Sequence, residues 1–238
     1  MPITISEEAG IRYLQFGAHW IQGAMRVKRP WTLELEYARD MMFPLLLRPR
    51  SWPRKVLTIG LGAAALTKFL YRHCPRSTID VVEIEPEVVL SAYQFFALPD
   101  DPGRLSIHID DGYKFVANAH ERYDFILLDG FDAKVEAGNL DSPRFYRNCR
   151  ALLKPGGIVA VNLVSRRGRP TASIDRLRKV FDDRVLVLPR NDANTVVLAS
   201  RDKPPFIPYD KLLGSARELK ARSGLDLQAT LSTLHERR

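Results

Sequence analysis

The sequence predicts an α/β protein with a mostly parallel sheet, and three features of the pattern support this. From residue 53 onward, short β-branched runs alternate with longer stretches of helical periodicity, which is typical of parallel strands linked by helices. One of these strands, YDFILL, is nearly all apolar, as expected for a sheet covered on both faces. The last two strands, RVLVLP and TVVLAS, are joined by a short loop, so they must run antiparallel to each other.

The first 52 residues are predicted to form a separate segment of strands and one helix. Two short strands, IRYLQFG and HWIQGAMRV, are expected within residues 11–28. Thr32 is a candidate N-cap for a helix through LELEYARDMMFPLLL, since Glu34 and Glu36 would then lie in the first turn. The basic, proline-containing stretch RPRSWPRK follows and marks a boundary near residue 52.

The core elements follow one another in a regular order. They are the strand VLTIGL, the helix ALTKFLYRH, the strand TIDVVEIE, the helix PEVVLSAYQFF, the strand LSIHID, the helix GYKFVANAH, the strand YDFILLD, a helix capped by Ser142 and ending near LLKPGG, the strand IVAVNLV, the helix ASIDRLRKVF and the final strand pair. Pro86 and Pro143 stand near the starts of their helices, where proline is tolerated. One amphipathic helix, around LLGSARELKAR, is expected in the tail. The predicted division is residues 1–52, 53–202 and 203–238.

Composition limits the possible classes of protein. The 238 residues are 45% hydrophobic and 27% charged, an ordinary globular composition, and no apolar run is long enough for a membrane span. The N-terminus lacks a signal pattern, and the two cysteines, Cys74 and Cys149, lack metal-ligand spacing, so a cytoplasmic protein is expected. The net charge of +8 allows a nucleic-acid binder, but the basic residues are scattered and this hypothesis rests on charge alone.

Polar residues gather where the first three core strands end, the edge at which open α/β sheets bind ligands. Gly60 and Gly62 allow a tight turn before a helix N-terminus. Glu83 ends the second strand and suits a ribose diol. Asp111, followed by Gly112, could accept a hydrogen bond from an adenine amino group. A plain helix cap is the alternative for both acids, and the glycines and Glu83 alone do not separate a dinucleotide from an adenosyl sulfonium.

Two further acids follow the fourth strand in the stretch LLDGFDAK. Asp129 ends a nearly all-apolar strand, and Asp132 lies three residues later with no helix beginning at once. We interpret this pair as the reaction centre. The order of these polar sets and the closing antiparallel pair favour a class I methyltransferase-like (Rossmann-like) sheet over a dehydrogenase sheet of six parallel strands, partly by analogy of fold.

From Tyr37 to Ser200 the chain resembles the spermidine synthase family of polyamine aminopropyltransferases, in particular its short bacterial branch. The resemblance is carried by VLTIGLG, VVEIEPEVV, LSIHIDDGYKFV, YDFILLDGFDA and FYRNCRALLKPGGIVAVN. It implies transfer of an aminopropyl group from decarboxylated S-adenosylmethionine to a polyamine such as putrescine. No metal and no tightly bound cofactor are implied, no membrane partner is expected, and a homodimer is expected.

The resemblance also implies roles for individual residues. The donor nucleoside would be bound by Gly60, Gly62, Glu83, Asp111 and Gly112. Asp129 would be the general base, and Asp132 would be the second acid of the same loop. Tyr37 and Asn162 would contribute to binding the substrate, Asn162 standing where the family often has glutamine.

Several residues depart from the family pattern. Ala63 replaces the loop aspartate that helps to hold the donor's ammonium, and Gly130-Phe131 replaces two serines between the acids. Ala38 and Arg39 replace Gln and Glu after the tyrosine, and an arginine there is expected to repel a polyamine. Two alternatives therefore stay open: an S-adenosylmethionine-dependent methyltransferase, and a non-catalytic protein that binds a nucleoside or a polyamine.

Overall fold

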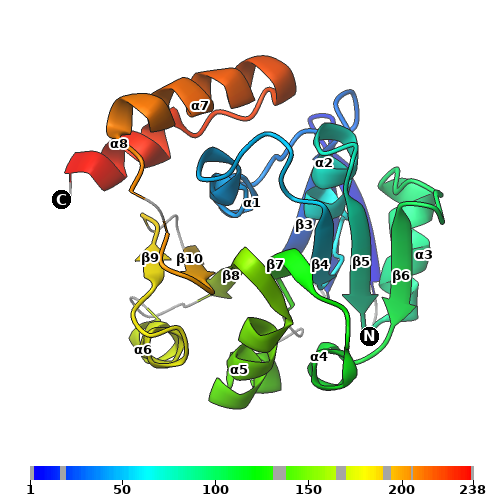
Figure 1. Cartoon of the computed structure of the whole chain (residues 1–238). Helices are drawn as coiled ribbons and strands as arrows, with labels where there is room; N and C mark the ends of the chain where they lie inside the picture. The colour runs from blue at the N-terminus through cyan, green and yellow to red at the C-terminus, as the bar shows by residue number, and fades with distance from the viewer. Residues whose placement is uncertain are drawn as a thin grey trace.

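A seven-stranded sheet forms the centre of the molecule (Figure 1). The computed structural model describes residues 3–16, 20–130, 138–164, 170–189, 194–204 and 206–236. The strand order is β6-β5-β4-β7-β8-β10-β9. The strands are β4 (Lys55–Ile59), β5 (Thr78–Glu83), β6 (Leu105–Ile109), β7 (Tyr123–Leu128), β8 (Leu153–Val164), β9 (Val185–Val187) and β10 (Asn194–Ser200).

The directions of the strands confirm the predicted fold class. The pairs from β6 across to β8 are parallel, whereas β10 is antiparallel to both β8 and β9. This is a mostly parallel sheet with an antiparallel pair at one end, as the short loop between the last two strands predicted. The strand order runs outward from β4 in both directions, to β5 and β6 on one side and to β7 and β8 on the other, which creates a crevice between β4 and β7 at their carboxyl ends.

Helices cover both faces of this sheet (Figure 1). Two helices, α2 (Ala65–His73) and α3 (Pro86–Phe95), pack into one apolar core. A second apolar core contains residues of α4 (Gly112–Asn118), α5 (Pro143–Leu152) and α6 (Thr171–Val180). Ser142 caps α5 as predicted, its Oγ accepting a hydrogen bond from the Phe145 N–H at 3.3 Å. Pro143 follows at the first helical position, where its missing N–H costs no hydrogen bond.

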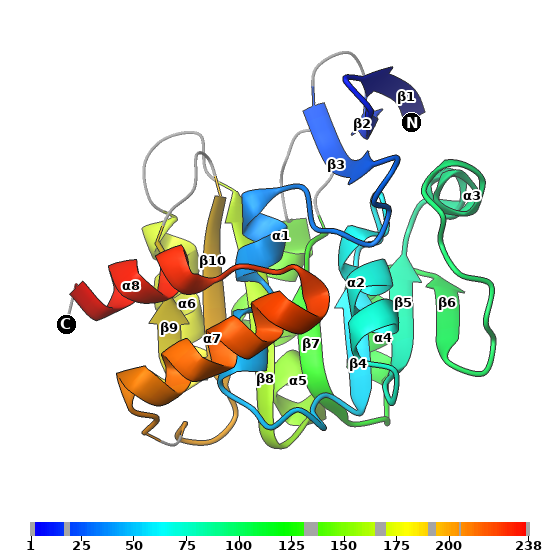
Figure 2. The ribbon, with the colours of Figure 1, turned by 90° about the horizontal axis from the view of Figure 1, so that it is seen from above.

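A three-stranded antiparallel sheet precedes this core. Its strands are β1 (Ile3–Glu8), β2 (Ile11–Phe16) and β3 (Trp20–Arg26), and it lies beyond the carboxyl ends of the central strands (Figure 2). The sequence predicted the last two strands and missed β1. The reason is that ITISEE ends in two exposed glutamates, so its weak alternation of apolar and polar residues gave no clear strand signal.

The predicted long helix after Thr32 is wrong. The structure has the short helix α1 (Glu36–Asp40) and then a 3-10 turn, η1 (Phe43–Leu46). The Thr32 hydroxyl donates to the Arg29 carbonyl at 2.8 Å and caps nothing, because the helix begins after Leu35. Pro44 lies at the start of η1, where it has no N–H to continue an α-helix.

The C-terminal tail contains two helices, α7 (Tyr209–Ser223) and α8 (Gln228–Glu236), where the sequence predicted one. Gly224, with a φ of 75°, ends α7 and turns the chain. The Thr230 hydroxyl then donates to the buried Asp40 carboxylate at 2.8 Å, which ties α8 to α1. The division of the chain at residues 52 and 202 stays a prediction.

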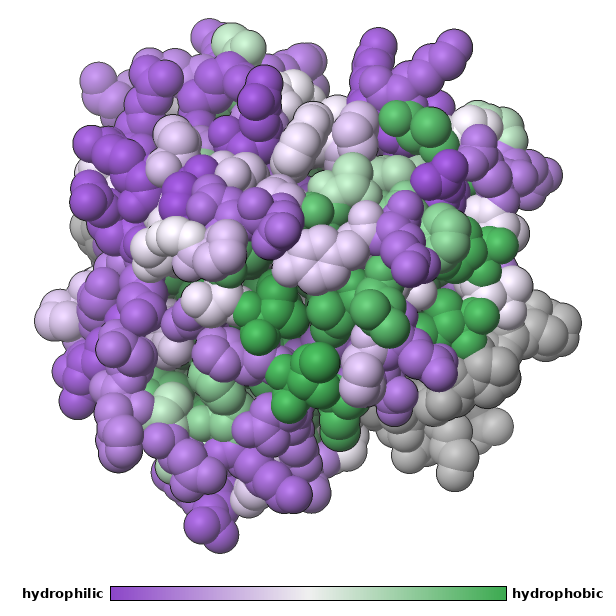
Figure 3. All heavy atoms as spheres, turned by 90° about the vertical axis from the view of Figure 1, so that its right-hand side faces the viewer, coloured by the Kyte–Doolittle hydropathy of each residue, from purple (hydrophilic) through white to green (hydrophobic). Residues whose placement is uncertain are grey.

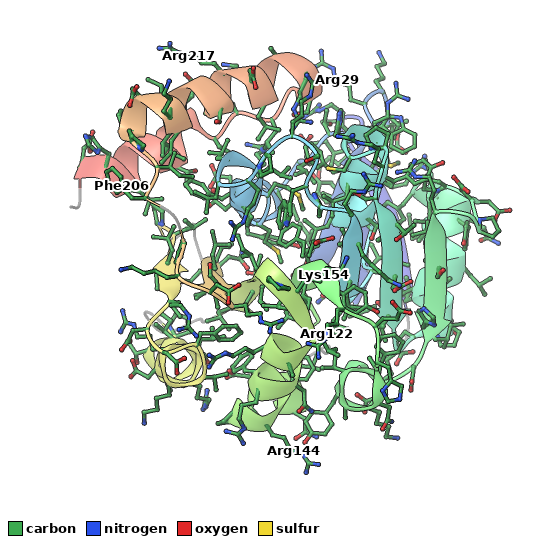
Figure 4. The ribbon with its side chains drawn as sticks, in the orientation of Figure 1. Arg29, Arg122, Arg144, Lys154, Phe206 and Arg217 are labelled. Carbon is green, nitrogen blue, oxygen red and sulfur yellow. The ribbon has the colours of Figure 1, made fainter. Side chains whose placement is uncertain are left out.

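Basic side chains project from opposite sides of the molecule (Figure 4). The labelled Arg144 projects from α5 below the sheet, whereas Arg29 and Arg217 lie at the opposite side near α7 (Figure 4). Apolar side chains gather instead on the face over α3 and β6 (Figure 3), where Leu90 and Ile109 are 59% and 57% exposed. In the described part of the chain, no helix has the length and apolar character needed to cross a membrane.

Candidate active site

The loop after β4 is held against the loop after β7 by a glycine. Gly60 has a φ of 91°, and any side chain placed on it would collide with the backbone carbonyl of Asp129. Gly62 also has a positive φ, 51°, and carries the loop into α2. The two glycines therefore let the β4 loop turn and bring it into contact with the strand end that carries Asp129.

Glu83 links the end of β5 to the same loop. Its side chain is buried, and its two carboxylate oxygens accept the backbone N–H groups of Leu61 at 2.8 Å and Glu85 at 3.0 Å. Burial raises the pKa of Glu83, and these backbone hydrogen bonds oppose that rise. Glu83 thus shapes the glycine loop, and each of its oxygens keeps a further lone pair for a ligand.

A pocket of about 250 Å³ opens at the carboxyl ends of β4, β5, β6 and β7. Its lining includes Gly60, Glu83, Asp111 and Gly112, so four of the five predicted nucleoside-binding residues meet in one place. A Cβ on Gly112 would lie 2.5 Å from Ile59 Cγ2, so glycine is needed where α4 begins. The pocket combines an apolar floor with carboxylates at its edge, which suits an adenosine with its ribose.

Asp111 also caps the helix that borders this pocket. Its Oδ1 accepts the Tyr113 N–H at 2.8 Å, so the alternative of a helix cap holds for this residue. Capping does not exclude ligand contact, because a carboxylate has about four acceptor positions. Tyr113 also lines the pocket and was not predicted, because nothing in the sequence around it marks it as a ligand-binding residue.

Asp129 is the centre of a second group of predicted residues. Tyr37, on α1, donates its hydroxyl to Oδ2 at 3.3 Å, and Asn162, on β8, donates Nδ2 to Oδ1 at 2.9 Å. Burial raises the pKa of Asp129 to about 6, although both hydrogen bonds lower it. The pKa of Tyr37 is raised well above its ordinary value by burial and by the adjacent carboxylate, so the phenol stays a hydrogen-bond donor.

A small pocket beside Asp129 brings in residues that the sequence did not indicate. It is lined by Tyr37, by Ala63 of the glycine loop, and by Gln22, Gly23 and Ala24 of β3. The single glycine inside the predicted strand was an available signal, since an isolated strand glycine often marks a close backbone approach. The sequence could not indicate that Gly23 contacts Ala63 of the glycine loop, because the two residues are forty positions apart.

One expectation about this region is wrong, and another lies outside the described residues. Arg39 does not enter the site: its guanidinium donates to the carbonyls of Leu33 at 2.9 Å and Glu34 at 2.7 Å, because α1 turns position 39 away from Asp129. It cannot repel a bound cation in the way expected. Asp132 and Phe131 fall within residues 131–137, which the structure does not describe.

The described residues also bear on metal chemistry. Within residues 3–16, 20–130, 138–164, 170–189, 194–204 and 206–236, no group of three or more His, Cys, Asp or Glu side chains is arranged to hold a metal ion. Cys74 and Cys149 are free and buried. Burial raises the pKa of Cys74 to about 11, so this thiol stays protonated and inert.

The fold is that of a class I methyltransferase-like protein, with one pocket at the carboxyl ends of the central strands and a second pocket beside the Asp129 carboxylate. Within that class, a sequence model described as the spermine/spermidine synthase domain matches residues 35–165. The polyamine aminopropyltransferase of Chromobacterium violaceum is 34% identical over 235 residues, covering 98% of this chain and 89% of the relative. The chain therefore belongs to the spermine/spermidine synthase family.

Two solved structures of differently named proteins show the same fold. A structure described as "a probable spermidine synthase from Corynebacterium glutamicum" superimposes with a TM-score of 0.76 at 20% identity, over 92% of this chain and 83% of that one. Human methyltransferase-like protein 13, solved in complex with SAH, gives a TM-score of 0.69 at 25% identity, over 80% of this chain and 93% of that one.

Proposed function

We propose that this protein transfers an aminopropyl group from decarboxylated S-adenosylmethionine to an amine, with putrescine as the first acceptor to test. The observation that carries the proposal is Asp129, a carboxylate with a raised pKa that lies beside a nucleoside pocket and is fixed by two hydrogen bonds. Family membership supports the reaction type, since relatives that match 98% of this chain are named polyamine aminopropyltransferases.

The transfer requires an uncharged amine at the carbon next to the donor's sulfur. An alkyl ammonium has a pKa of about 10.4, so proton transfer to an ordinary aspartate at about 3.9 is uphill by roughly 9 kcal/mol. With Asp129 at about 6, the remaining gap is about 4 units, or roughly 6 kcal/mol. A sulfonium near the amine lowers the amine's pKa further, so Asp129 can accept the proton as the new C–N bond forms. The C–S bond of the sulfonium breaks in the same step, and its electron pair leaves with methylthioadenosine.

The positions of Tyr37 and Asn162 suggest how they support this step. Asn162 holds Oδ1 of Asp129 at 2.9 Å, whereas Oδ2 has, among the described side chains, only the longer 3.3 Å contact from Tyr37. Oδ2 is therefore the oxygen that we assign to the incoming amine, with Tyr37 beside it at the pocket. We propose that Asn162, which is only 4% exposed, serves the substrate by orienting Asp129. The predicted contact of Asp132 with the substrate stays a prediction.

Glu83 is proposed to hold the ribose, and its charge can be tested without removing its bulk. Replacing Glu83 by glutamine is expected to weaken the binding of methylthioadenosine by about tenfold or more, because hydrogen bonds to a charged group contribute about 1.5–3 kcal/mol each. Isothermal titration calorimetry checks this result. Glu87→Gln, an exposed change on α3, is the matched control. Unchanged affinity in Glu83→Gln removes Glu83 from the ribose site.

The proposed reaction is tested directly by its products. The protein is incubated with decarboxylated S-adenosylmethionine and putrescine, and the products are identified by mass spectrometry. Methylthioadenosine together with spermidine is the expected result. Methylthioadenosine binding without turnover would instead support the non-catalytic alternative and contradict the proposed activity.

A methyltransferase is the second candidate. It is favoured by the fold shared with human methyltransferase-like protein 13, which was solved with SAH, and by Ala63, which removes an acid from the place where a donor carboxylate would approach. The acidic reaction centre favours the first candidate, because methyl transfer needs chiefly that the acceptor be positioned. A homodimer and a cytoplasmic location, both expected from the sequence, stay proposals.

A further inference from the structure

The strand β3 lies unusually close to the glycine loop. A Cβ placed on Gly23 would be 2.5 Å from the Ala63 Cβ and 2.8 Å from the Ala63 nitrogen, distances too short for real side chains. Gly23 is buried, and Ala63 is 2% exposed. A larger residue at either position would have to push the strand away from the loop, because close-packed interiors leave no slack for an added methyl group.

This contact forms one wall of the small pocket beside Asp129. The pocket has a volume of about 20 Å³, and its lining includes Gly23, Leu61 and Ala63 as well as Tyr37 and Asp129. This volume is close to the space needed by one water molecule. The wall therefore leaves little room for any chain beside Asp129, and each heavy atom that a carboxylate branch adds meets it more severely than an unbranched chain does.

The position of the pocket identifies the part of the donor that reaches it. Leu61 lines this pocket and directly follows Gly60 of the larger pocket, and in the proposed reaction Asp129 lies beside the carbon that is attacked. The chain attached to the donor's sulfur must therefore pass between these two points. The described residues that line this small pocket include one charged side chain, Asp129, and no cation. A carboxylate placed there would lose its hydration and face a like charge, which is costly.

We propose that Gly23 and Ala63 form a steric filter for the chain carried by the donor's sulfur. The filter admits an unbranched aminopropyl chain and excludes the aminocarboxypropyl chain of S-adenosylmethionine. This inference rests on the proposed function and adds Gly23 as a specificity-determining residue. This protein then selects its donor through the close packing of β3 against the glycine loop. The packing occurs at Ala63, where the family typically carries a carboxylate.

Three nucleosides separate this filter from the rest of the donor site. Calorimetry with methylthioadenosine, decarboxylated S-adenosylmethionine and S-adenosylmethionine is expected to show that the wild type binds the decarboxylated donor at least about tenfold more tightly than the intact one. Gly23→Ala is expected to weaken binding of the decarboxylated donor by about tenfold or more, from overpacking of the wall. Methylthioadenosine lacks the longer chain, so its affinity should change by less than about threefold.

Two further variants control this experiment. Gly214→Ala adds the same methyl group in α7, where nothing lies within 4 Å of the added Cβ, and should leave all three affinities unchanged. Ala63→Gly widens the wall and should reduce the preference for the decarboxylated donor by at least about threefold. The Ala63→Gly variant tests the filter even if the Gly23→Ala protein does not fold. An unchanged preference in Ala63→Gly overturns the filter, whereas failure of the wild type to bind methylthioadenosine overturns the proposed function itself.

Discussion

Replacing Asp129 by asparagine is expected to abolish aminopropyl transfer while leaving methylthioadenosine affinity within about tenfold of the wild type. General-base catalysis contributes about 10²- to 10⁴-fold, so a loss of about three orders of magnitude is expected when the proton acceptor is removed. The nucleoside pocket lies in other residues, which explains the retained affinity. In the wild type, kcat/KM is expected to fall as the pH drops through about 6, because protonated Asp129 cannot accept the amine's proton.

The same variant is expected to be more stable than the wild type at pH 8. The native pKa of Asp129, about 6, lies above its unfolded value, so the native state holds the proton more tightly. Stability from this group is therefore present at low pH and is lost as the pH rises toward 6 and above. The raised pKa of Asp129 corresponds to a loss of about 2 kcal/mol in the free energy of unfolding at pH 8, after allowance for partial solvent contact. The Asp129→Asn substitution removes this loss.

Urea unfolding at pH 8 and pH 3.5 measures this gain in stability. The difference between Asp129→Asn and wild type should be present at pH 8 and absent at pH 3.5, where the carboxyl group is mostly protonated in both the native and the unfolded state. The exposed Asp175 of α6 supplies a matched control, and Asp175→Asn should stay within about 0.5 kcal/mol of the wild type at both values. Full transfer activity in Asp129→Asn would contradict its role as the base.

Introducing an aspartate at position 63 is expected to damage this protein, although the family typically carries that residue there. Ala63 is buried against Gly23 of β3, so there is no room for the larger aspartate side chain. The described residues that line the pocket also include no cation to pair with the new carboxylate. Overpacking alone typically lowers the free energy of unfolding by about 1–3 kcal/mol. Burial of a charge adds to this, so a loss of about 3 kcal/mol or more is expected.

Thermal and urea unfolding of Ala63→Asp, measured beside the exposed helix variant Ala172→Asp, separates this effect from a general effect of added charge. Ala172→Asp should lie within about 0.5 kcal/mol of the wild type, since it adds an acid to the first turn of α6. A stable Ala63→Asp protein that binds the decarboxylated donor more tightly than the wild type would show that β3 does not close this position.

The central sheet could be predicted from the sequence because most of its strands, β4, β5, β7, β8 and β10, consist largely of buried residues. Runs such as YDFILL leave few alternatives to a buried strand, and Ser142-Pro143 marks the start of α5 through local hydrogen bonding alone. The errors lie where local signals were weak or were outweighed. Thr32 and the acids after it predicted a long helix, but Pro44 and the packing of η1 limited α1 to five residues.

The site was predictable wherever its residues end parallel strands. Glu83, Asp111 and Asp129 each follow an apolar strand, and parallel strands bring such positions to one edge. The contact between Gly23 and Ala63 was not predictable, because it joins two sheets through packing that no local pattern records. Arg39 was misjudged for a related reason: its direction depends on where α1 begins, and the backbone carbonyls that hold it carry no sequence signal.

The most direct test of the proposed reaction offers the protein both donors in one mixture. Equal concentrations of decarboxylated S-adenosylmethionine and S-adenosylmethionine are supplied with putrescine, and the released nucleoside is identified by mass spectrometry. We predict methylthioadenosine together with an aminopropylated amine, and no accumulation of adenosylhomocysteine. Release of adenosylhomocysteine with a methylated acceptor, and no methylthioadenosine, would contradict aminopropyl transfer.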